Sequence, residues 1–136
     1  MTPDAILETA LYARDLEAAA DFYSRVFGLE EVLRVEGRHV FFGCGPGMLL
    51  IFNPEATTKA PSGLPVPTHG AEGQGHMCFR VSGAELDRWA THLNKLNIAI
   101  EADFQWPNGA RSIYVRDPAG NSVELSEPKL WKRPTR

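Results

Sequence analysis

The sequence predicts an α+β fold made of two βαβββ modules, whose helices cover one outer face of a mixed sheet. Three observations predict it. A strand–helix–three-strand pattern occurs twice, the two copies begin 68 residues apart, at Glu8 and His76, and a turn-rich segment separates them. Such repetition indicates one supersecondary unit used twice. We therefore expect a single domain, residues 1–136, with repeats at about 6–54 and 74–128 joined by loop 55–73.

The first module begins with the short strand Glu8–Ala13. Asp15 is a favourable helix N-cap, and Gly28 is a favourable end for the helix, because glycine adopts the left-handed conformation without strain. Apolar residues recur between them at helical spacing: Leu16, Ala19, Ala20, Tyr23, Val26 and Phe27. Three further strands are expected at residues 31–36, 38–43 and 48–53.

The second module repeats this order from the strand His76–Val81. Ser82 and Glu85 can form a capping box, and Asn97 suits the left-handed end of the helix. The apolar stripe between them consists of Leu86, Trp89, Leu93 and Leu96. Three strands are expected to follow, at residues 98–104, 111–116 and 122–127.

The segment between the modules, residues 55–75, is rich in Pro, Gly and Thr, which indicates a loop without an element of its own. A connection of this length in a small domain is often functional or mobile. His69 lies in it, seven residues before His76. We expect His69 either to close over a substrate or to be a solvated loop residue.

The bulk composition excludes several classes of function. The formal net charge of −3 and an isoelectric point near 5.8 provide no basic surface of the kind that holds a nucleic-acid backbone. No apolar run approaches the roughly 20 residues that span a bilayer, and the N-terminus lacks the features of a signal peptide. Cys44 and Cys78 lie far apart, so a disulfide framework is not indicated. We expect a cytoplasmic protein that binds neither nucleic acid nor membrane.

Glu8, His76 and Glu124 are predicted to stand on open sheet faces, because side chains along a strand alternate between its two faces. The residues beside them belong to the covered faces: Leu7, Thr9 and Leu11; Met77, Phe79 and Val81; Val123 and Leu125. A carboxylate within an apolar strand costs several kcal/mol unless it is paired or ligated. Glu124, between Val123 and Leu125, therefore indicates a bound cation, although a strand that simply turns Glu124 to solvent would show the same pattern.

Three stretches of the chain resemble the vicinal oxygen chelate superfamily. They are Tyr12–Tyr23 followed by Gly28-Leu29, then Gly75–Phe79, then Tyr114–Leu125, and the resemblance extends over about residues 6–128. The superfamily includes glyoxalase I, extradiol ring-cleaving dioxygenases, fosfomycin-resistance enzymes, methylmalonyl-CoA epimerase and bleomycin-binding proteins. The resemblance implies a mixed sheet that curls around a metal-binding cup, with the helices outside.

Metal ligands in this superfamily come from the first and last strands of each module, which here hold Glu8, Leu50, His76 and Glu124. Because Leu50 cannot coordinate a metal, the resemblance implies one divalent ion (Zn, Ni, Mn, Fe or Mg) bound by Glu8, His76 and Glu124. This set differs from glyoxalase I, which normally has four protein ligands. It also differs from the extradiol and fosfomycin enzymes, which have a histidine where Glu8 stands. The bleomycin binders lack the ligand set.

The resemblance implies a metal-dependent glyoxalase-like enzyme, with lyase or isomerase chemistry on a small substrate chelated through adjacent oxygens. The metal would act as a Lewis acid, and Glu8 or Glu124 would remove a proton beside a carbonyl. One alternative is an extradiol-type Fe(II) ring-cleaving dioxygenase, which would consume oxygen. The other is a bleomycin-resistance-type small-molecule binding protein, which would hold its ligand without turnover.

Residues 38–50 match residues 111–124, which places His39 and Phe41 at positions equivalent to Ser112 and Tyr114. Together with His69, these residues are candidates to bind substrate. Arg111 is either a clamp for a substrate carboxylate or a surface charge at a strand end. Cys78 is expected to line the cup and not to be a nucleophile.

The C-terminal residues 129–136 form a basic tail of unknown purpose, in which Trp131 is a candidate to dock onto the domain. Each half of the chain carries about four strands, which is half of the curled sheet that the superfamily wraps around its metal. The resemblance therefore implies a homodimer, in which Glu8 comes from one chain and His76 and Glu124 come from the other. The alternative is that the two halves of one chain close on each other, so that each monomer holds its own site.

Overall fold

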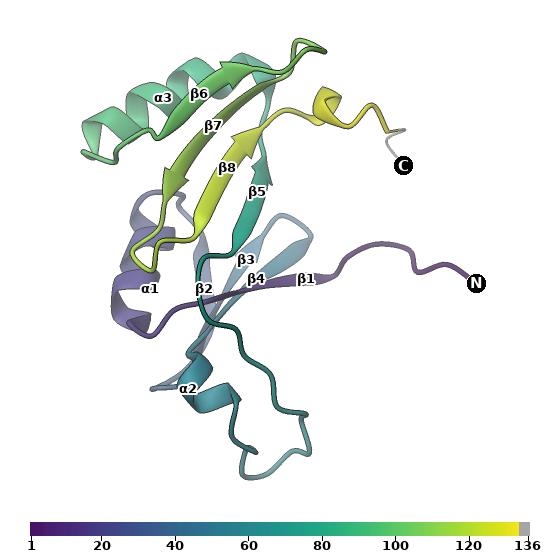
Figure 1. The fold of residues 1–136 in the computed structure, drawn as a ribbon, viewed down its shortest axis with the longest axis vertical. Coiled ribbons are helices and arrows are strands. Elements are labelled where there is room, and N and C mark those ends of the chain that lie inside the picture. Colours follow the sequence, from purple (N-terminus) through teal and green to yellow (C-terminus); the bar gives the residue numbers. More distant parts are fainter. Residues whose placement is uncertain (134–136) are drawn as a thin grey trace. The chain divides into compact units, whose positions relative to one another are not determined.

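The structure is a computed structural model that describes residues 1–133. It divides the chain into two compact units, Met1–Gly75 and His76–Arg136. Each unit carries one βαβββ module, and the boundary lies at the end of the predicted loop (Figure 1). The predicted fold class is confirmed: each unit has one four-stranded mixed sheet with a helix packed on it. Within residues 1–133, no helix has the length and apolar character needed to cross a bilayer.

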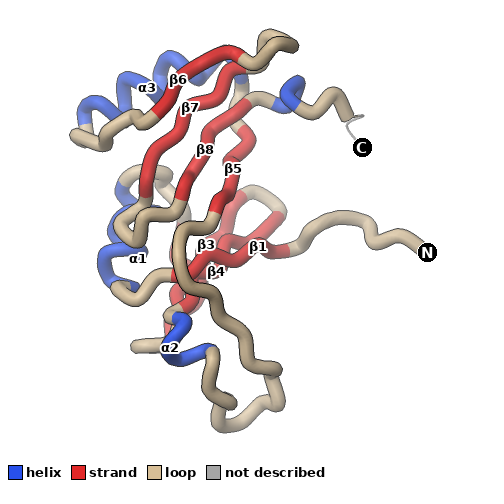
Figure 2. Tube along the Cα trace, viewed as in Figure 1, coloured by secondary structure: helices blue, strands red, loops and turns tan. Residues whose placement is uncertain are grey.

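The first unit contains a sheet with the strand order β1-β4-β3-β2. Its elements are β1 (Glu8–Tyr12), α1 (Leu16–Arg25), β2 (Glu30–Val35), β3 (His39–Cys44) and β4 (Gly47–Phe52). Strand β1 runs parallel to β4, and the other pairs are antiparallel. The strands are drawn in red in Figure 2. Helix α1 packs against β2, β3 and β4. The side chains fully buried in this unit include Tyr23, Val26, Val40, Phe42, Leu49 and Ile51.

The second unit repeats this sheet with the order β5-β8-β7-β6. Its elements are β5 (His76–Arg80), the 3₁₀ turn η1 (Gly83–Glu85), α3 (Leu86–Lys95), β6 (Ala102–Gln105), β7 (Arg111–Arg116), β8 (Ser122–Ser126) and the 3₁₀ turn η2 (Pro128–Leu130). Strand β5 is parallel to β8, as β1 is to β4. The core of this unit includes Leu86, Leu93, Ile113, Val115, Val123 and Leu125.

The two modules share their strand register as well as their order. Leu50 pairs with Ala10 and with Phe41 in the first sheet. Glu124 pairs with Cys78 and with Tyr114 in the second. Leu50 and Glu124 therefore occupy equivalent places, and so do Phe41 and Tyr114, as the hairpin match predicts. Glu8 and His76 are equivalent too, because each is the first residue of the first strand of its module.

The helix boundaries follow the predicted capping residues with one change. The Asp15 carboxylate accepts a hydrogen bond from the Ala18 amide (3.0 Å), and Gly28 and Asn97 adopt left-handed conformations with φ of 66° and 57°. Ser82 accepts a hydrogen bond from the Ala84 amide, so it caps the short turn η1 and not α3 itself.

Two sequence predictions of secondary structure were wrong. The strand predicted from residue 98 begins only at Ala102, because the Ile98 amide still bonds the Leu93 carbonyl (2.9 Å) and closes the preceding helix. The segment predicted to lack any element contains a short helix, α2 (Pro54–Thr57). Asn53 caps this helix by accepting a hydrogen bond from the Glu55 amide (3.1 Å).

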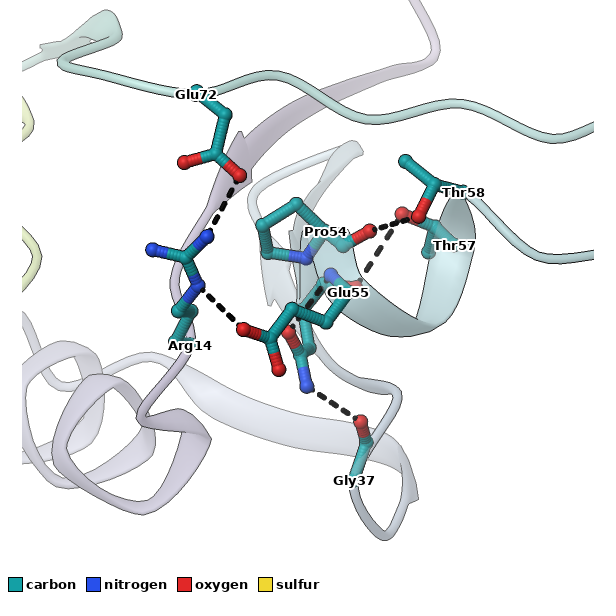
Figure 3. Close-up of polar contacts among 8 residues, drawn as sticks. Arg14, Gly37, Pro54, Glu55, Thr57, Thr58 and Glu72 are labelled. Atoms are coloured by element: carbon teal, nitrogen blue, oxygen red, sulfur yellow. Dashed lines mark hydrogen bonds and ion pairs between the residues drawn. The ribbon is translucent and has the colours of Figure 1, made fainter.

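Two ion pairs hold the segment after β4 within the first unit. The Arg14 guanidinium lies 3.0 Å from the Glu55 carboxylate and 2.7 Å from the Glu72 carboxylate (Figure 3). Glu55 lies near the start of the connecting segment and Glu72 near its end, so Arg14 forms an ion pair with each end of the segment.

Candidate functional site

The second unit brings together two of the three predicted metal ligands. His76 begins β5, and Glu124 lies at the centre of the neighbouring parallel strand β8. The His76 Nε2 atom is 3.3 Å from Oε1 of Glu124. The apolar residues Val123 and Leu125, on the other side of β8, are buried in the core. The alternation of side chains therefore turns Glu124 toward His76, as the sequence predicts.

The Glu124 carboxylate is buried but hydrogen-bonded. Its residue is 4% exposed, and its Oε2 atom accepts a hydrogen bond from the Ser112 hydroxyl at 2.6 Å. The Ser112 hydroxyl in turn accepts the Trp106 Nε1–H at 2.8 Å. Ser126 lies 3.0 Å from Ser112 and donates to the Arg111 carbonyl oxygen at 2.9 Å. This network holds one carboxylate oxygen and leaves the other facing His76.

The hydrogen bond of His76 Nδ1 determines which ring nitrogen carries a hydrogen. Nδ1 lies 3.1 Å from the Ser122 carbonyl oxygen, which can only accept, so Nδ1 carries a hydrogen. A neutral ring would turn a lone pair of Nε2 toward Glu124 Oε1, so the contact calls for either a proton on Nε2 or a cation between the two atoms. Histidine ligands of metals commonly donate their other N–H to a backbone carbonyl in this way.

The spacing of the pair also fits a metal ion. Two ligands bound about 2.1 Å from one ion, at angles between those of octahedral and tetrahedral coordination, lie roughly 3.0–3.4 Å apart. The observed separation of 3.3 Å lies within this range. A neutral imidazole and a carboxylate are ligands that Zn, Ni, Mn and Fe all accept. The residues present therefore fit a divalent ion of this kind.

The groups around Glu124 are held in their protonated forms. Burial, followed by the charge of Glu124, raises the pKa of the Cys78 thiol to about 12. The same two causes raise the pKa of Tyr114 to about 12. At neutral pH, neither Cys78 nor Tyr114 is an anion, and Cys78 is not an activated nucleophile. The ring of Tyr114 stacks beside that of His76, with centroids 6.2 Å apart.

A cavity of about 450 Å³ opens beside the pair, entirely within the second unit. Besides His76, Glu124 and Tyr114, it is lined by Trp106, Pro107, Asn108, Leu130 and Trp131. Sequence reasoning missed Trp106, Pro107, Asn108 and Leu130. Residues 107–109 (Pro-Asn-Gly) indicate a turn, but the direction in which a turn presents its neighbours is not a local property of the sequence.

The third predicted ligand, Glu8, lies in the first unit as the exposed first residue of β1. Its equivalent in the other module is His76. Among residues 1–133, neither unit contains a group of three or more His, Cys, Asp or Glu side chains that could hold a metal ion. Leu50, at the place equivalent to Glu124, is 6% exposed and packs as a core residue. Binding of metal by Glu8 remains a prediction.

His39, Phe41 and His69 meet in an aromatic cluster of the first unit. The ring of His39 stacks on Phe41 with centroids 4.1 Å apart, and neither of its buried nitrogens has a hydrogen-bond partner in the described part of the chain. Burial, followed by the charge of Arg38, lowers the pKa of His39. His69 packs against Phe52 at 4.6 Å, and its Nδ1 lies 2.7 Å from the Tyr12 hydroxyl. His69 is therefore half-buried and hydrogen-bonded, not freely solvated.

Arg111 is occupied by two carboxylates of the second unit. Its guanidinium lies 2.8 Å from the Asp103 carboxylate and 2.6 Å from that of Asp87. These partners raise the pKa of Arg111 further above its ordinary value. The pairing supports a structural charge that joins β7 to β6 and α3, the second of the two alternatives from the sequence.

The C-terminal tail is described as far as residue 133. Residues 134–136 lie outside the described residues. Trp131 lines the cavity while remaining 75% exposed, so it stands at the rim and is not buried in the unit.

Comparison with known proteins places the chain in a family. The model of the Glyoxalase/Bleomycin resistance protein/Dioxygenase superfamily matches residues 5–125. A solved structure described as lactoylglutathione lyase from Agrobacterium tumefaciens is 54% identical, with a TM-score of 0.94, over 98% of this chain and 100% of that chain. No curated protein matched the chain.

More distant solved structures share the fold. The fosfomycin resistance protein FosX from Mesorhizobium loti is 25% identical, with a TM-score of 0.65, over 98% of both chains. A glyoxalase/bleomycin resistance protein/dioxygenase from Nocardioides is 23% identical, with a TM-score of 0.74, over 93% of this chain and 85% of that chain. The family match over nearly the whole chain, together with the relative at 54% identity, shows that this chain belongs to the Glyoxalase/Bleomycin resistance protein/Dioxygenase superfamily.

Proposed function

We propose that this chain is a metal-dependent enzyme of the glyoxalase type, with lyase or isomerase chemistry on a small substrate that offers two adjacent oxygens. The observation that carries the proposal is the pair of His76 Nε2 and Glu124 Oε1, 3.3 Å apart, with the other atom of each group fixed by Ser122 and Ser112. The relative described as lactoylglutathione lyase supports it. Lactoylglutathione carries a hydroxyl beside a thioester carbonyl, which is a pair of adjacent oxygens.

In this proposal Glu8, His76 and Glu124 hold one divalent ion, Zn, Ni, Mn, Fe or Mg. Support for Glu8 comes from its equivalence to His76 in the repeated module. When bound, the ion supplies a Lewis acid beside the substrate oxygens. Leu50, in place of a second carboxylate, leaves a coordination position to water or substrate.

The two carboxylates have different parts in the proposed reaction. Glu124 is buried and its Oε2 is fixed by Ser112, so it serves to hold the ion. Glu8 is exposed, and its side chain forms no hydrogen bond in the described part of the chain. A carboxylate with that freedom can move to remove a proton beside the substrate carbonyl. Glu8 is therefore the stronger of the two candidates for the base.

We propose further that the active species is a homodimer acting on a small molecule in the cytoplasm. Strands β1 and β5 are edges of their sheets, and they carry Glu8 and His76. An edge strand offers unpaired backbone groups to another strand. Pairing of such edges between two copies would complete each site.

Metal titration of the purified chain, followed by calorimetry, tests the proposal. His76→Ala and Glu124→Ala should each weaken binding of Ni²⁺ or Zn²⁺ by about a hundredfold or more, whereas Glu8→Gln should lose turnover with a smaller loss of metal. Variants that all retain full affinity would contradict the site. Oxygen uptake with catechols and Fe²⁺ would instead establish the dioxygenase alternative, and ligand retention without turnover would establish a binding protein.

A further inference from the structure

The cavity beside His76 and Glu124 is mostly apolar. Apart from the pair and Asn108, its walls are the rings of Trp106, Tyr114 and Trp131 with the side chains of Pro107 and Leu130. Its volume of about 450 Å³ is ample for a ring in addition to a small polar group. A substrate consisting only of polar atoms would leave these walls in contact with water.

The aromatic walls are held in place before any ligand arrives. Trp106 is fixed by its hydrogen bond to Ser112 and by Phe104, whose ring centroid lies 4.8 Å away. Tyr114 lies between His76 at 6.2 Å and Phe104 at 5.9 Å, in nearly parallel stacks. A wall that is already ordered loses little conformational entropy when a ligand binds.

The part of the wall formed by Leu130 and Trp131 is held by hydrogen bonds to its backbone. The Asn108 side-chain amide donates to the carbonyl oxygens of Leu130 (3.1 Å) and Lys129 (3.4 Å). The Trp131 amide donates to the Pro128 carbonyl, which closes the turn η2. The C-terminal segment is thereby tied to the β6–β7 turn, and Leu130 and Trp131 face the cavity.

We infer that this cavity takes a flat aromatic ring of the substrate, while the adjacent oxygens of the substrate lie at the His76–Glu124 pair. The substrate class is thus an aryl-substituted hydroxy-carbonyl or hydroxy-acid compound. The choice of an aromatic over an aliphatic group follows from the walls, because three of the lining side chains carry aromatic rings, which favour offset or edge-on contact with another ring. This inference rests on the proposed function for the place of the oxygens, but not for the place of the ring.

The test compares mandelate with lactate, two 2-hydroxy acids with the same adjacent oxygens that differ by a phenyl ring in place of a methyl group. Calorimetry on the full-length protein, with Ni²⁺ and without it, gives the ratio of their affinities. Burial of the ring should make mandelate bind roughly ten- to a hundredfold more tightly than lactate. Hexahydromandelate, whose ring is saturated, should bind less tightly than mandelate.

Two variants locate the preference. Trp131→Leu should remove most of it, because Trp131 forms the rim of the cavity. Trp89→Leu is the matched control, because Trp89 belongs to α3 and does not line the cavity. Equal affinities for mandelate and lactate would overturn the inference, and so would a preference that survives both Trp131→Leu and Trp106→Leu. A mandelate preference in a protein that binds no Ni²⁺ would support the aromatic cavity while contradicting the proposed metal function.

Discussion

At the scale of single residues, Ser112 fixes the orientation of the Glu124 carboxylate. Its hydroxyl donates to Oε2 at 2.6 Å and is itself fixed by Trp106, so the carboxylate has one defined orientation. We predict that Ser112→Ala weakens binding of Ni²⁺ or Zn²⁺ by about 10- to 100-fold, the usual effect of removing a hydrogen bond that orients a ligand. Calorimetric titration measures this change.

Ser122 provides the matched control for that prediction. It contacts His76 through its backbone carbonyl, which any residue supplies. Ser122→Ala should therefore leave the metal affinity within about twofold of the original value. A Ser112→Ala variant that binds metal as well as Ser122→Ala does would show that Glu124 needs no such support.

Leu50 stands at the place that holds Glu124 in the other module. It is 6% exposed, so Leu50→Glu would bury a carboxylate. We predict that Leu50→Glu lowers the melting temperature of the metal-free protein and that added Ni²⁺ or Zn²⁺ restores it, because ligation removes the cost of the buried charge. Leu50→Gln keeps the size without the charge and should show a weaker response to metal. Equal responses of the two variants would contradict a ligand position at residue 50.

The sequence predicts which residues share a sheet face with Glu124, but not which side chains form hydrogen bonds with it. Alternation along each strand places Glu124, His76 and Cys78 on one face, since it depends on local periodicity alone. The hydrogen bond from Trp106 through Ser112 to Glu124 joins a turn to two strands. It depends on strand register and on how the turn directs its side chains, which single-residue patterns do not contain.

At the scale of elements, Arg111 joins β7 to β6 and α3 through Asp103 and Asp87. The hydrogen bond from Arg111 lowers the pKa of Asp103 below its ordinary value. The carboxylate therefore contributes stability above the pKa of the unfolded chain, and this contribution is lost as the pH falls through the lower pKa of the folded state. Because the pair is partly exposed, the contribution is at most about 1 kcal/mol.

We predict that Asp103→Asn lowers the free energy of unfolding at pH 7 by up to about 1 kcal/mol, and that this deficit shrinks as the pH falls below about 4. Urea unfolding at a series of pH values measures it. Asp4→Asn, at an exposed position near the N-terminus, should show no such pH-dependent difference. A deficit for Asp103→Asn that grows toward acid pH would contradict the assigned role of Arg111.

The two mispredicted elements have separate physical reasons. Residues 98–101 have a high β-propensity, but the Ile98 amide donates a hydrogen bond to the Leu93 carbonyl at the end of α3. Pairing with β7 therefore starts only at Glu101, whose amide lies 2.8 Å from the Tyr114 carbonyl oxygen. In the connecting segment, Asn53 followed by Pro54 is a helix start, yet the helix spans only Pro54–Thr57. Competition between a helix end and a strand start is settled by tertiary contacts, whereas the long amphipathic stretches of α1 and α3 are evident from periodicity.

At the scale of the whole molecule, the repeat places Glu8 and His76 at equivalent positions of the two modules. The sheet of each unit has the same order and register, but among the described residues a histidine and a carboxylate lie within ion-pair distance only in the second unit. The first unit contributes Glu8, and its equivalent of Glu124 is Leu50. The proposed three-ligand site would require that Glu8 of one module meet the His76–Glu124 pair of another.

The partner of the His76–Glu124 pair is expected to come from a second copy of the chain. We predict a two-fold homodimer in which Glu8 of one chain completes the His76–Glu124 pair of the other, with an interface that buries more than roughly 2,000 Å². Glu8→Ala and His76→Ala chains, mixed after unfolding and refolded together, test it. In a heterodimer with shared sites, one site carries both lesions and the other carries none. Random refolding should therefore restore about one quarter of the original sites. Sites owned by single chains would restore none, and a monomer in light scattering at micromolar concentration would rule out sharing.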